Sequence, residues 1–244
     1  MPSNSPPAAR CILITGAGSG IGAGIAAELA RAGHHLVITD VNLDAARAVA
    51  QSIRHGGGSA EAFALDVTSD HSIEAALGGV SRPVDVLVNN AGLQHVAPLE
   101  EFPMQKWQFL VDVMLVGVAR LTRALLPGMR ARGFGRIVNI GSIHSLVASP
   151  YKSAYVSAKH GLVGFSKVIA LETADTDLTI NTICPTYVKT PLVDKQIADR
   201  LGIQERTIKA HLTSIFERLG VRNRTQASVI LRELELSDPS KLIA

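Results

Sequence analysis

Three side chains in the second half of the chain could move a proton to or from an alcohol. Tyr155 and Lys159 are four residues apart in a helical pattern, and Ser142 lies thirteen residues before the tyrosine. A phenol needs help to act as a base near neutral pH, because its usual pKa is near ~10. A lysine one helical turn away supplies favourable charge, and Ser142 could hydrogen-bond the reacting oxygen. Alternatively, Tyr155 and Lys159 form an ordinary exposed helix pair.

A glycine-rich turn near the N-terminus could bind a dinucleotide. Gly16, Gly20 and Gly22 follow a predicted strand and open a predicted helix, where the backbone can approach a pyrophosphate. The second predicted strand ends at Asp40, whose carboxylate could accept hydrogen bonds from ribose hydroxyls and would repel a 2′-phosphate. NAD is therefore expected rather than NADP. The alternatives are a simple tight turn and an aspartate that only ends its strand.

The elements that would position these residues alternate along the chain. Strands are predicted over residues 11–16, 35–40, 60–67, 84–90, 136–142 and 179–185, with helical patterns such as 22–32 and 44–53 between them. Strands rich in Val, Ile and Leu on both faces indicate a parallel sheet covered on two sides, a doubly wound α/β (Rossmann) fold. Cys11 and Cys184 fall in predicted buried strands without a metal-binding spacing, so we expect packing thiols and no metal site.

The length of the apolar runs bears on the cellular location of the protein. No stretch approaches the ~20 apolar residues of a membrane span, and the start of the chain lacks the apolar core of a signal peptide. We therefore expect a cytoplasmic protein without membrane contact.

Further motifs follow the glycine turn in a fixed order. They are Asp66-Val67, Asn89-Asn90-Ala91-Gly92, Ser142 and Tyr155-x-x-x-Lys159. With these motifs, residues 10–197 resemble the short-chain dehydrogenase/reductase family, and within it the D-3-hydroxybutyrate dehydrogenases. The resemblance implies Ser142, Tyr155 and Lys159 as catalytic residues. It implies a nucleotide site formed by Thr15, Gly16, Ser19, Gly20, Ile21, Gly22, Asp40, Asp66, Val67, Asn90, Ala91, Gly92, Tyr155, Lys159, Pro185, Val188 and Thr190.

The same resemblance implies a small 3-hydroxy acid as substrate, with D-3-hydroxybutyrate oxidised to acetoacetate by NAD. Amide and cationic donors would hold the substrate carboxylate. The implied substrate-binding residues are Gln94, Ser142, His144, Lys152, Tyr155 and Gln196. The resemblance also implies a homo-oligomer, a dimer or a tetramer.

Two positions depart from the family pattern. Thr186 stands where the family usually has glycine after the proline, and Met114 stands where it has an asparagine that connects the lysine to solvent through water. A methionine cannot relay protons, and core packing explains it better. The family's last strand is also missing, so impaired turnover is an alternative.

From Lys195 the sequence resembles the helix-turn-helix of LuxR-type regulators. Residues 195–224 contain seven basic and three acidic residues, which can be a solvated face or a nucleic-acid footprint. The predicted recognition helix spans residues 205–219 and has one apolar stripe. The residues that could contact DNA are Arg206, Thr207, Lys209 and Thr213. The module lacks its first helix, so these helices could instead cover the open edge of the sheet.

We therefore expect four regions: a flexible tail over 1–9, an NAD-binding dehydrogenase domain over 10–193, a helical segment over 194–232 and a tail over 233–244. The first hypothesis is an NAD-dependent dehydrogenase. The second is a DNA-binding or NAD-sensing regulator whose dehydrogenase half is inactive. The third is a recombined chain that folds poorly and does neither.

Overall fold

The computed structural model describes residues 9–186. The chain divides into two units, Met1–Val188 and Lys189–Ala244, and every described residue belongs to the first. The expected boundary near residue 193 and the predicted helical segment over 194–232 lie outside the described residues.

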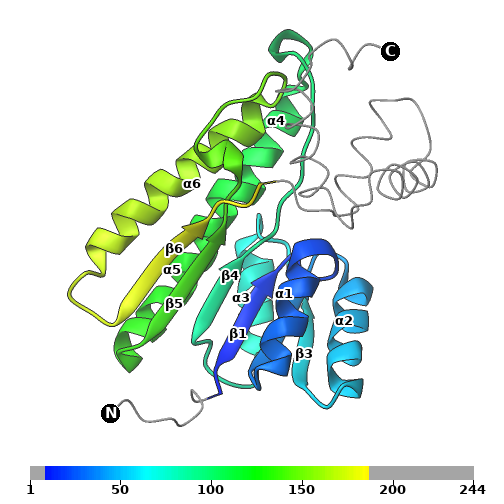
Figure 1. The fold of residues 1–244 in the computed structure, drawn as a ribbon, viewed down its shortest axis with the longest axis vertical. Coiled ribbons are helices and arrows are strands. Elements are labelled where there is room, and N and C mark those ends of the chain that lie inside the picture. The colour runs from blue at the N-terminus through cyan, green and yellow to red at the C-terminus, as the bar shows by residue number, and fades with distance from the viewer. Residues whose placement is uncertain (1–8, 187–244) are drawn as a thin grey trace, which may run out of the picture. The chain divides into compact units, whose positions relative to one another are not determined.

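Six parallel strands form one sheet in the order β3-β2-β1-β4-β5-β6 (Figure 1). Their bounds are β1 Cys11–Thr15, β2 His35–Asp40, β3 Ser59–Ala64, β4 Val86–Asn89, β5 Gly135–Ile140 and β6 Leu178–Ile183. The strand order reverses between β1 and β4, which is where open parallel sheets bind ligands at the carboxyl ends of their strands. The predicted doubly wound parallel sheet is confirmed.

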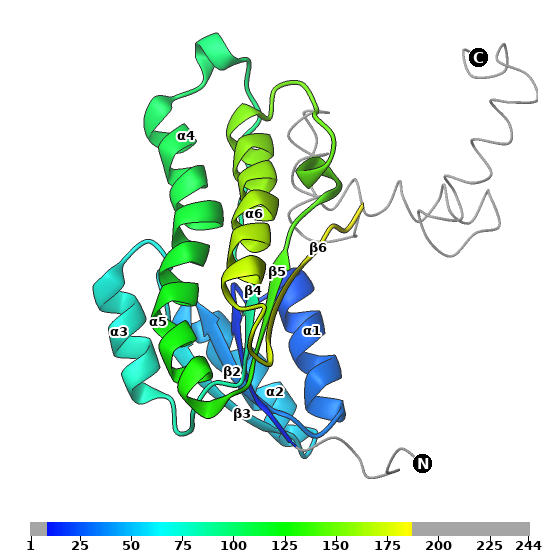
Figure 2. The ribbon, with the colours of Figure 1, turned by 90° about the vertical axis from the view of Figure 1, so that its left-hand side faces the viewer.

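Helices cover both faces of the sheet (Figure 2). On one face lie α1 Gly20–Arg31 and α2 Leu43–His55; on the other lie α3 Asp70–Gly79, α5 Gly117–Arg132 and α6 Ser153–Glu172. Alternate residues of β1 point to opposite faces, so Leu13 packs in one core with Leu121 of α5, and Ile14 packs in the other with Ala26 of α1. This burial on both faces explains the aliphatic runs in the strand sequences.

One long helical segment changes its hydrogen-bond pattern in the middle. Helix α4, Met104–Val111, passes into a π-helical turn, η2, Asp112–Val116, and then into α5. Gly117 begins α5 where a Cβ atom would come within 2.9 Å of the carbonyl oxygen of Val67. Short 3-10 helices, η1 Leu99–Glu101 and η3 Ile143–Ser145, precede α4 and α6 respectively.

Several strands end earlier than the sequence predicts. The strand predicted over 60–67 ends at Ala64, and Asp66 then turns the chain by accepting a hydrogen bond from the Thr68 N–H at 2.9 Å. The strand predicted over 179–185 ends at Ile183. Cys184 therefore lies outside the strand and is only half-buried, which corrects the expectation of a buried strand thiol, whereas Cys11 is buried as expected.

A row of buried polar side chains crosses the second half of the sheet. Asn89 Nδ2 donates to Asn139 Oδ1 at 2.8 Å, and Asn139 Nδ2 donates to Ser166 Oγ of α6 at 2.9 Å. Ser166 Oγ also lies 2.8 Å from Thr182 Oγ1 of β6. These bonds join β4, β5, β6 and α6 by side chains as well as by packing.

None of the helices within residues 9–186 is long and apolar enough to cross a membrane.

Candidate active site

The glycine-rich turn packs against the end of β4. Gly16 has φ +60, and a Cβ atom there would come within 2.8 Å of Ala91 Cα. Asn90 Nδ2 donates to the carbonyl oxygens of Thr15 and Gly16 at 2.9 and 3.0 Å, while Thr15 Oγ1 accepts from the N–H groups of Asn90 and Ala91, each at 3.0 Å. The ends of β1 and β4 are thus tied together. Gly92, the next residue, is exposed.

Asp40 at the end of β2 holds the same turn from the other side. Its Oδ2 accepts from the Gly18 N–H and its Oδ1 from the Asn42 N–H, both at 3.0 Å. A Cβ atom at Gly18 would come within 2.9 Å of the Asp40 carboxylate. The carboxylate is half-buried beside the turn, which is the position that a hydrogen bond to a ribose hydroxyl requires.

The remaining nucleotide positions lie around this turn. Ser19 and Gly20, at the start of α1, are exposed, and Ser19 makes no side-chain cap for that helix. The first amides of a helix lack internal partners and can therefore bind an anion. Asp66 is fixed by Thr68, whose Oγ1 lies 2.7 Å from Asp66 Oδ1, and Val67 beside it is buried. Ile21 is half-buried and Gly22 is buried.

Ser142 and Tyr155 come together from two different elements. Ser142 precedes η3, where its Oγ accepts from the His144 N–H at 3.2 Å and its N–H donates to Ser145 Oγ at 3.1 Å. Tyr155 lies in the first turn of α6 and is half-buried. Burial raises the pKa of the Tyr155 phenol, and a side-chain hydrogen bond with Ser142 lowers it. The serine therefore opposes the cost of ionising the tyrosine.

Lys159 lies on α6 one turn after Tyr155 and is buried. Its Nζ donates to the carbonyl oxygen of Ile140 at 2.6 Å and lies 5.8 Å from the centre of the Tyr155 ring. Burial lowers the pKa of Lys159 from 10.5 to about 8, and the nearby Cys184 raises it. The ammonium is therefore desolvated and bonded to the β5 carbonyl, and the expected lowering of the tyrosine pKa by Lys159 stays a prediction.

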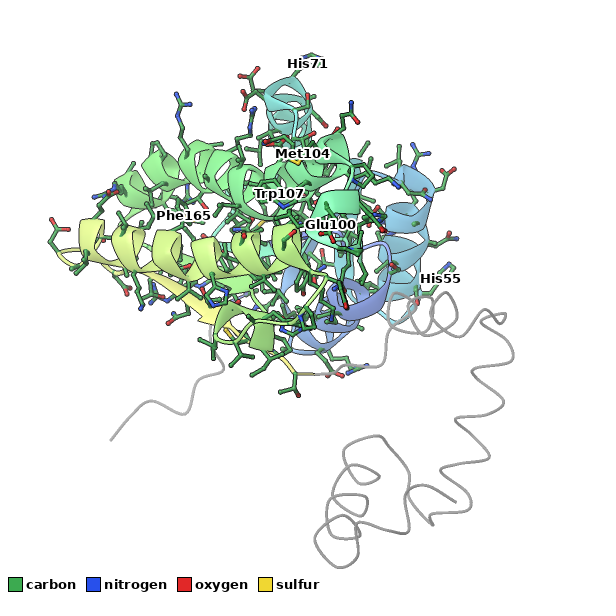
Figure 3. All side chains as sticks on the ribbon, turned by 90° about the horizontal axis from the view of Figure 1, so that it is seen from above. His55, His71, Glu100, Met104, Trp107 and Phe165 are labelled. Atoms are coloured by element: carbon green, nitrogen blue, oxygen red, sulfur yellow. The ribbon has the colours of Figure 1, made fainter. Side chains whose placement is uncertain are left out.

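Helix α4 positions the start of α6. Trp107 Nε1 donates to Ser153 Oγ at 3.2 Å, two residues before Tyr155, and Figure 3 shows Trp107 between the two helices. Met114, in the π-helical turn, is 1% exposed, and a Cβ atom at Gly92 would lie 3.7 Å from its sulfur. The methionine thus fills the space behind the Asn90-Ala91-Gly92 turn, as its core-packing interpretation predicts.

Two of the implied carboxylate-binding residues, His144 and Lys152, lie beside the tyrosine. His144 Nε2 lies 3.4 Å from Lys152 Nζ, and the His144 and Tyr155 rings meet edge to face with their centres 6.1 Å apart. Gln94 is half-buried in the chain that follows β4. The Ile143 N–H donates to the Pro185 carbonyl oxygen at 2.8 Å, which ties the end of β6 to η3.

This geometry can be compared with known proteins. The family profile described as short chain dehydrogenase matches residues 10–201. The chain belongs to the short-chain dehydrogenase family. It is therefore an oxidoreductase, and its described fold is the nucleotide-binding part of that family. A second profile, of bacterial regulatory proteins of the luxR family, matches residues 191–231.

Two curated relatives of this short-chain dehydrogenase are D-beta-hydroxybutyrate dehydrogenases. The enzyme from Cupriavidus necator H16 is 46% identical over 214 residues, covering 83% of this chain and 81% of that enzyme. The enzyme from Rhizobium meliloti 1021 is 42% identical over 207 residues, covering 82% and 80%. The crystal structure of a gluconate 5-dehydrogenase from Burkholderia cenocepacia J2315 in complex with NADP and tartrate matches with a TM-score of 0.72 and 36% identity, covering 75% of this chain and 73% of that one.

Some of the predicted site of this dehydrogenase lies outside the described residues. These positions are Val188, Thr190, Gln196, Arg206, Thr207, Lys209 and Thr213.

Sequence reasoning missed the roles of Asn42, which caps α2 beside Asp40, and of Ser153, which accepts from Trp107. An asparagine before an apolar helical run was a usable capping signal. No local pattern marks the long-range contact between Trp107 and Ser153. Within residues 9–186, no group of three or more His, Cys, Asp or Glu side chains could hold a metal ion.

Proposed function

We propose that this short-chain dehydrogenase oxidises a small 3-hydroxy acid with NAD, with D-3-hydroxybutyrate giving acetoacetate as the first candidate. The observation that supports this substrate is the 3.4 Å approach of His144 Nε2 to Lys152 Nζ beside the Tyr155 ring. A lysine ammonium and an imidazole next to a phenol suit a substrate whose carboxylate lies near its reacting hydroxyl. The names of the two curated relatives agree with this choice.

The residues present fit NAD. The turn over residues 16–22 places the start of α1 where a pyrophosphate can meet free amides, and Asp40 stands at the end of the neighbouring strand. A carboxylate there accepts hydrogen bonds from a ribose diol and repels a phosphate on it. The solved relative from Burkholderia cenocepacia holds NADP, so the choice of NAD rests on Asp40.

The proposed chemistry assigns one role to each residue. Bound NAD would accept the hydride from the carbinol carbon. Tyr155 takes the hydroxyl proton. The single Ser142 O–H stabilises the ionised phenol in the free site and donates to the substrate oxygen when substrate is bound. His144, Lys152 and Gln94 bind the carboxylate, with Gln196 as a further predicted donor. Lys159 binds the nucleotide ribose and adds positive charge near Tyr155 when protonated. Pro185, Thr186, Val188 and Thr190 belong to the segment proposed to close over the nucleotide.

The deciding experiment follows reduced cofactor with purified full-length protein, NAD and D-3-hydroxybutyrate. We expect activity with NAD, much weaker activity with NADP, and a loss of about 10²-fold to 10⁴-fold in Tyr155→Phe. Phenylalanine keeps the ring packing, so Tyr155→Phe should still bind NAD, which a fluorescence titration checks. Full activity in Tyr155→Phe would refute the proposal.

DNA binding is the second candidate function, and the luxR-family match over residues 191–231 favours it. This match overlaps the dehydrogenase match over residues 191–201. Binding of duplex DNA should then weaken steeply with salt and in Arg206→Ala and Lys209→Ala. Arg47→Ala, at an exposed arginine of α2, is the matched control. No binding at low salt would exclude this candidate. The homo-oligomer implied by the family stays a prediction, which light scattering tests.

A further inference from the structure

Tyr151 has a backbone conformation that is rare for an aromatic residue. Its φ is 65, and it is the one residue other than glycine with a positive φ within residues 9–186. In this left-handed region the Cβ atom crowds the neighbouring carbonyl, so any side chain costs conformational free energy that glycine avoids. Such outliers concentrate at functional sites, where the surrounding structure holds them in place.

The Tyr151 side chain makes no hydrogen bond or ring contact with residues 9–186, and the residue is 59% exposed. By contrast, the Tyr151 backbone is fixed, because its carbonyl oxygen accepts from the Ala97 N–H at 3.0 Å. The backbone of Tyr151 is therefore held in place while its ring is exposed.

That position lies beside the residues proposed to bind the substrate carboxylate. Tyr151 directly precedes Lys152, whose Nζ lies 3.4 Å from His144 Nε2. Its partner Ala97 is three residues after Gln94. The hydrogen bond between Ala97 and Tyr151 thus joins the chain that follows β4 to the chain that precedes α6, and both lie beyond the carboxyl ends of the strands (Figure 1).

Exposed apolar side chains also occur in the two chain segments that carry Gln94 and His144. Val96 is 48% exposed, Leu146 is 62% exposed and Val147 is 50% exposed. Val147 is tied to the site, since its carbonyl oxygen lies 3.4 Å from His144 Nδ1. Exposed apolar side chains that group around polar donors are typical of a ligand site.

We infer that Tyr151 determines specificity for 3-hydroxy acids that carry an apolar group on C2. This inference rests on the proposed function. With the carboxylate at His144 and Lys152 and the hydroxyl at Tyr155, C2 lies between them, and the C4 methyl lies on the far side of C3. In this inference, a substituent on C2 lies against Tyr151, Val96 and Val147. The ring removes that substituent from water, and the rigid backbone holds the ring ready to do so.

The test compares D-3-hydroxybutyrate, its 2-ethyl derivative and D-3-hydroxyhexanoate in the wild type, Tyr151→Phe, Tyr151→Ala and Tyr151→Gly. In the Ala and Gly variants, kcat/KM for the 2-ethyl acid should fall about tenfold relative to D-3-hydroxybutyrate, as expected for two carbons returned to water. The ratio for the hexanoate, which is longer at the other end, should not change. Tyr151→Phe should behave as the wild type.

Measurements of Tm distinguish the loss of the Tyr151 ring from the relief of its backbone strain. Tyr151→Gly should raise the Tm while Tyr151→Ala should not, although both lose the C2 preference. Leu171→Ala, at a 79% exposed leucine of α6, is the surface control. If both variants oxidise D-3-hydroxybutyrate and the ratio of kcat/KM for the 2-ethyl acid to that for D-3-hydroxybutyrate is unchanged, the role of Tyr151 is overturned and the proposed function stands. A wild type that oxidises none of the three acids would overturn the proposed function, and the role of Tyr151 with it.

Discussion

The ammonium nitrogen of Lys159 lies 2.6 Å from the carbonyl oxygen of Ile140, where β5 ends. A buried ammonium is poorly solvated, and this one hydrogen bond replaces only part of its water. The pKa of Lys159 accordingly falls to about 8, so the side chain is partly neutral just above physiological pH. The contact thus links the proposed catalytic site to the stability of the fold.

The stability of the protein should therefore depend on Lys159 between pH 7 and pH 9. The folded-state pKa of about 8 lies below the unfolded value of 10.5, so the unfolded chain binds more protons in this range and stability rises with pH. Urea unfolding should show that the wild type gains about 1.4 kcal/mol from pH 7 to pH 9 relative to Lys159→Met. The comparison with the variant is needed because Cys11, with a pKa raised to about 12, lowers stability above pH 9. Equal slopes in the two proteins would contradict the lowered lysine pKa.

Removing either carboxylate donor should weaken substrate binding more than turnover. His144→Ala and Lys152→Ala should each raise the KM for D-3-hydroxybutyrate by about 10-fold to 100-fold, the usual value of a hydrogen bond to a charged group. His160→Ala, at an exposed histidine of α6, is the matched control and should leave KM unchanged. Steady-state kinetics decides this, and a fall in kcat without a rise in KM would argue against carboxylate binding.

Changing Asp40 should alter cofactor choice and stability separately. Asp40→Ala removes the charge that repels a 2′-phosphate, so the ratio of kcat/KM for NADP to that for NAD should rise about tenfold or more. It also removes the acceptor for the Gly18 and Asn42 N–H groups, at a cost of about 1 to 3 kcal/mol. Asp40→Asn keeps an acceptor and should separate the two effects. Asp44→Ala, on the exposed start of α2, controls for loss of surface charge. An unchanged cofactor ratio in both Asp40 variants would remove the basis for choosing NAD.

Met114 offers a test of whether turnover is impaired. Met114→Asn restores the residue type that the family resemblance implies, and we expect kcat to rise by up to about tenfold if proton release limits the rate. The variant should lose about 1 to 3 kcal/mol of stability, because the site is 1% exposed and apolar. Met114→Leu conserves volume and should change neither quantity much. If kcat in Met114→Asn equals that of Met114→Leu, proton relay through this position does not limit turnover.

Much of the fold could be predicted because β1, β2 and β4 carry aliphatic residues on both faces, and glycines mark the first turn. The ends of the strands were less predictable. After β3, Asp66 turns the chain by accepting side-chain and backbone hydrogen bonds from Thr68, and hydrophobic periodicity does not detect such a turn. The π-helical turn at Met114 was also invisible, since the surrounding residues fit an ordinary helix equally well.

The candidate site was predicted as a set of residue types, and the structure supplies their contacts. The sequence could not show that Lys159 bonds to Ile140, or that Trp107 holds Ser153, because both pairs are far apart along the chain. It also gave no sign of the positive φ at Tyr151. The backbone conformation there depends on the Ala97 hydrogen bond, which forms only after the two loops meet.

The row of Asn89, Asn139 and Thr182 bears on how the sheet avoids misfolding. Asn89 pairs with Asn139, and Asn139 with Thr182, as direct neighbours across β4, β5 and β6. The other strand residues are mostly aliphatic and would pack almost as well if one strand slid by two positions, since its faces would be preserved. Such a slip would leave the buried amides without partners, at about 1 to 3 kcal/mol each. A few polar side chains therefore specify the register of these strands, because aliphatic packing alone would give two registers of similar free energy.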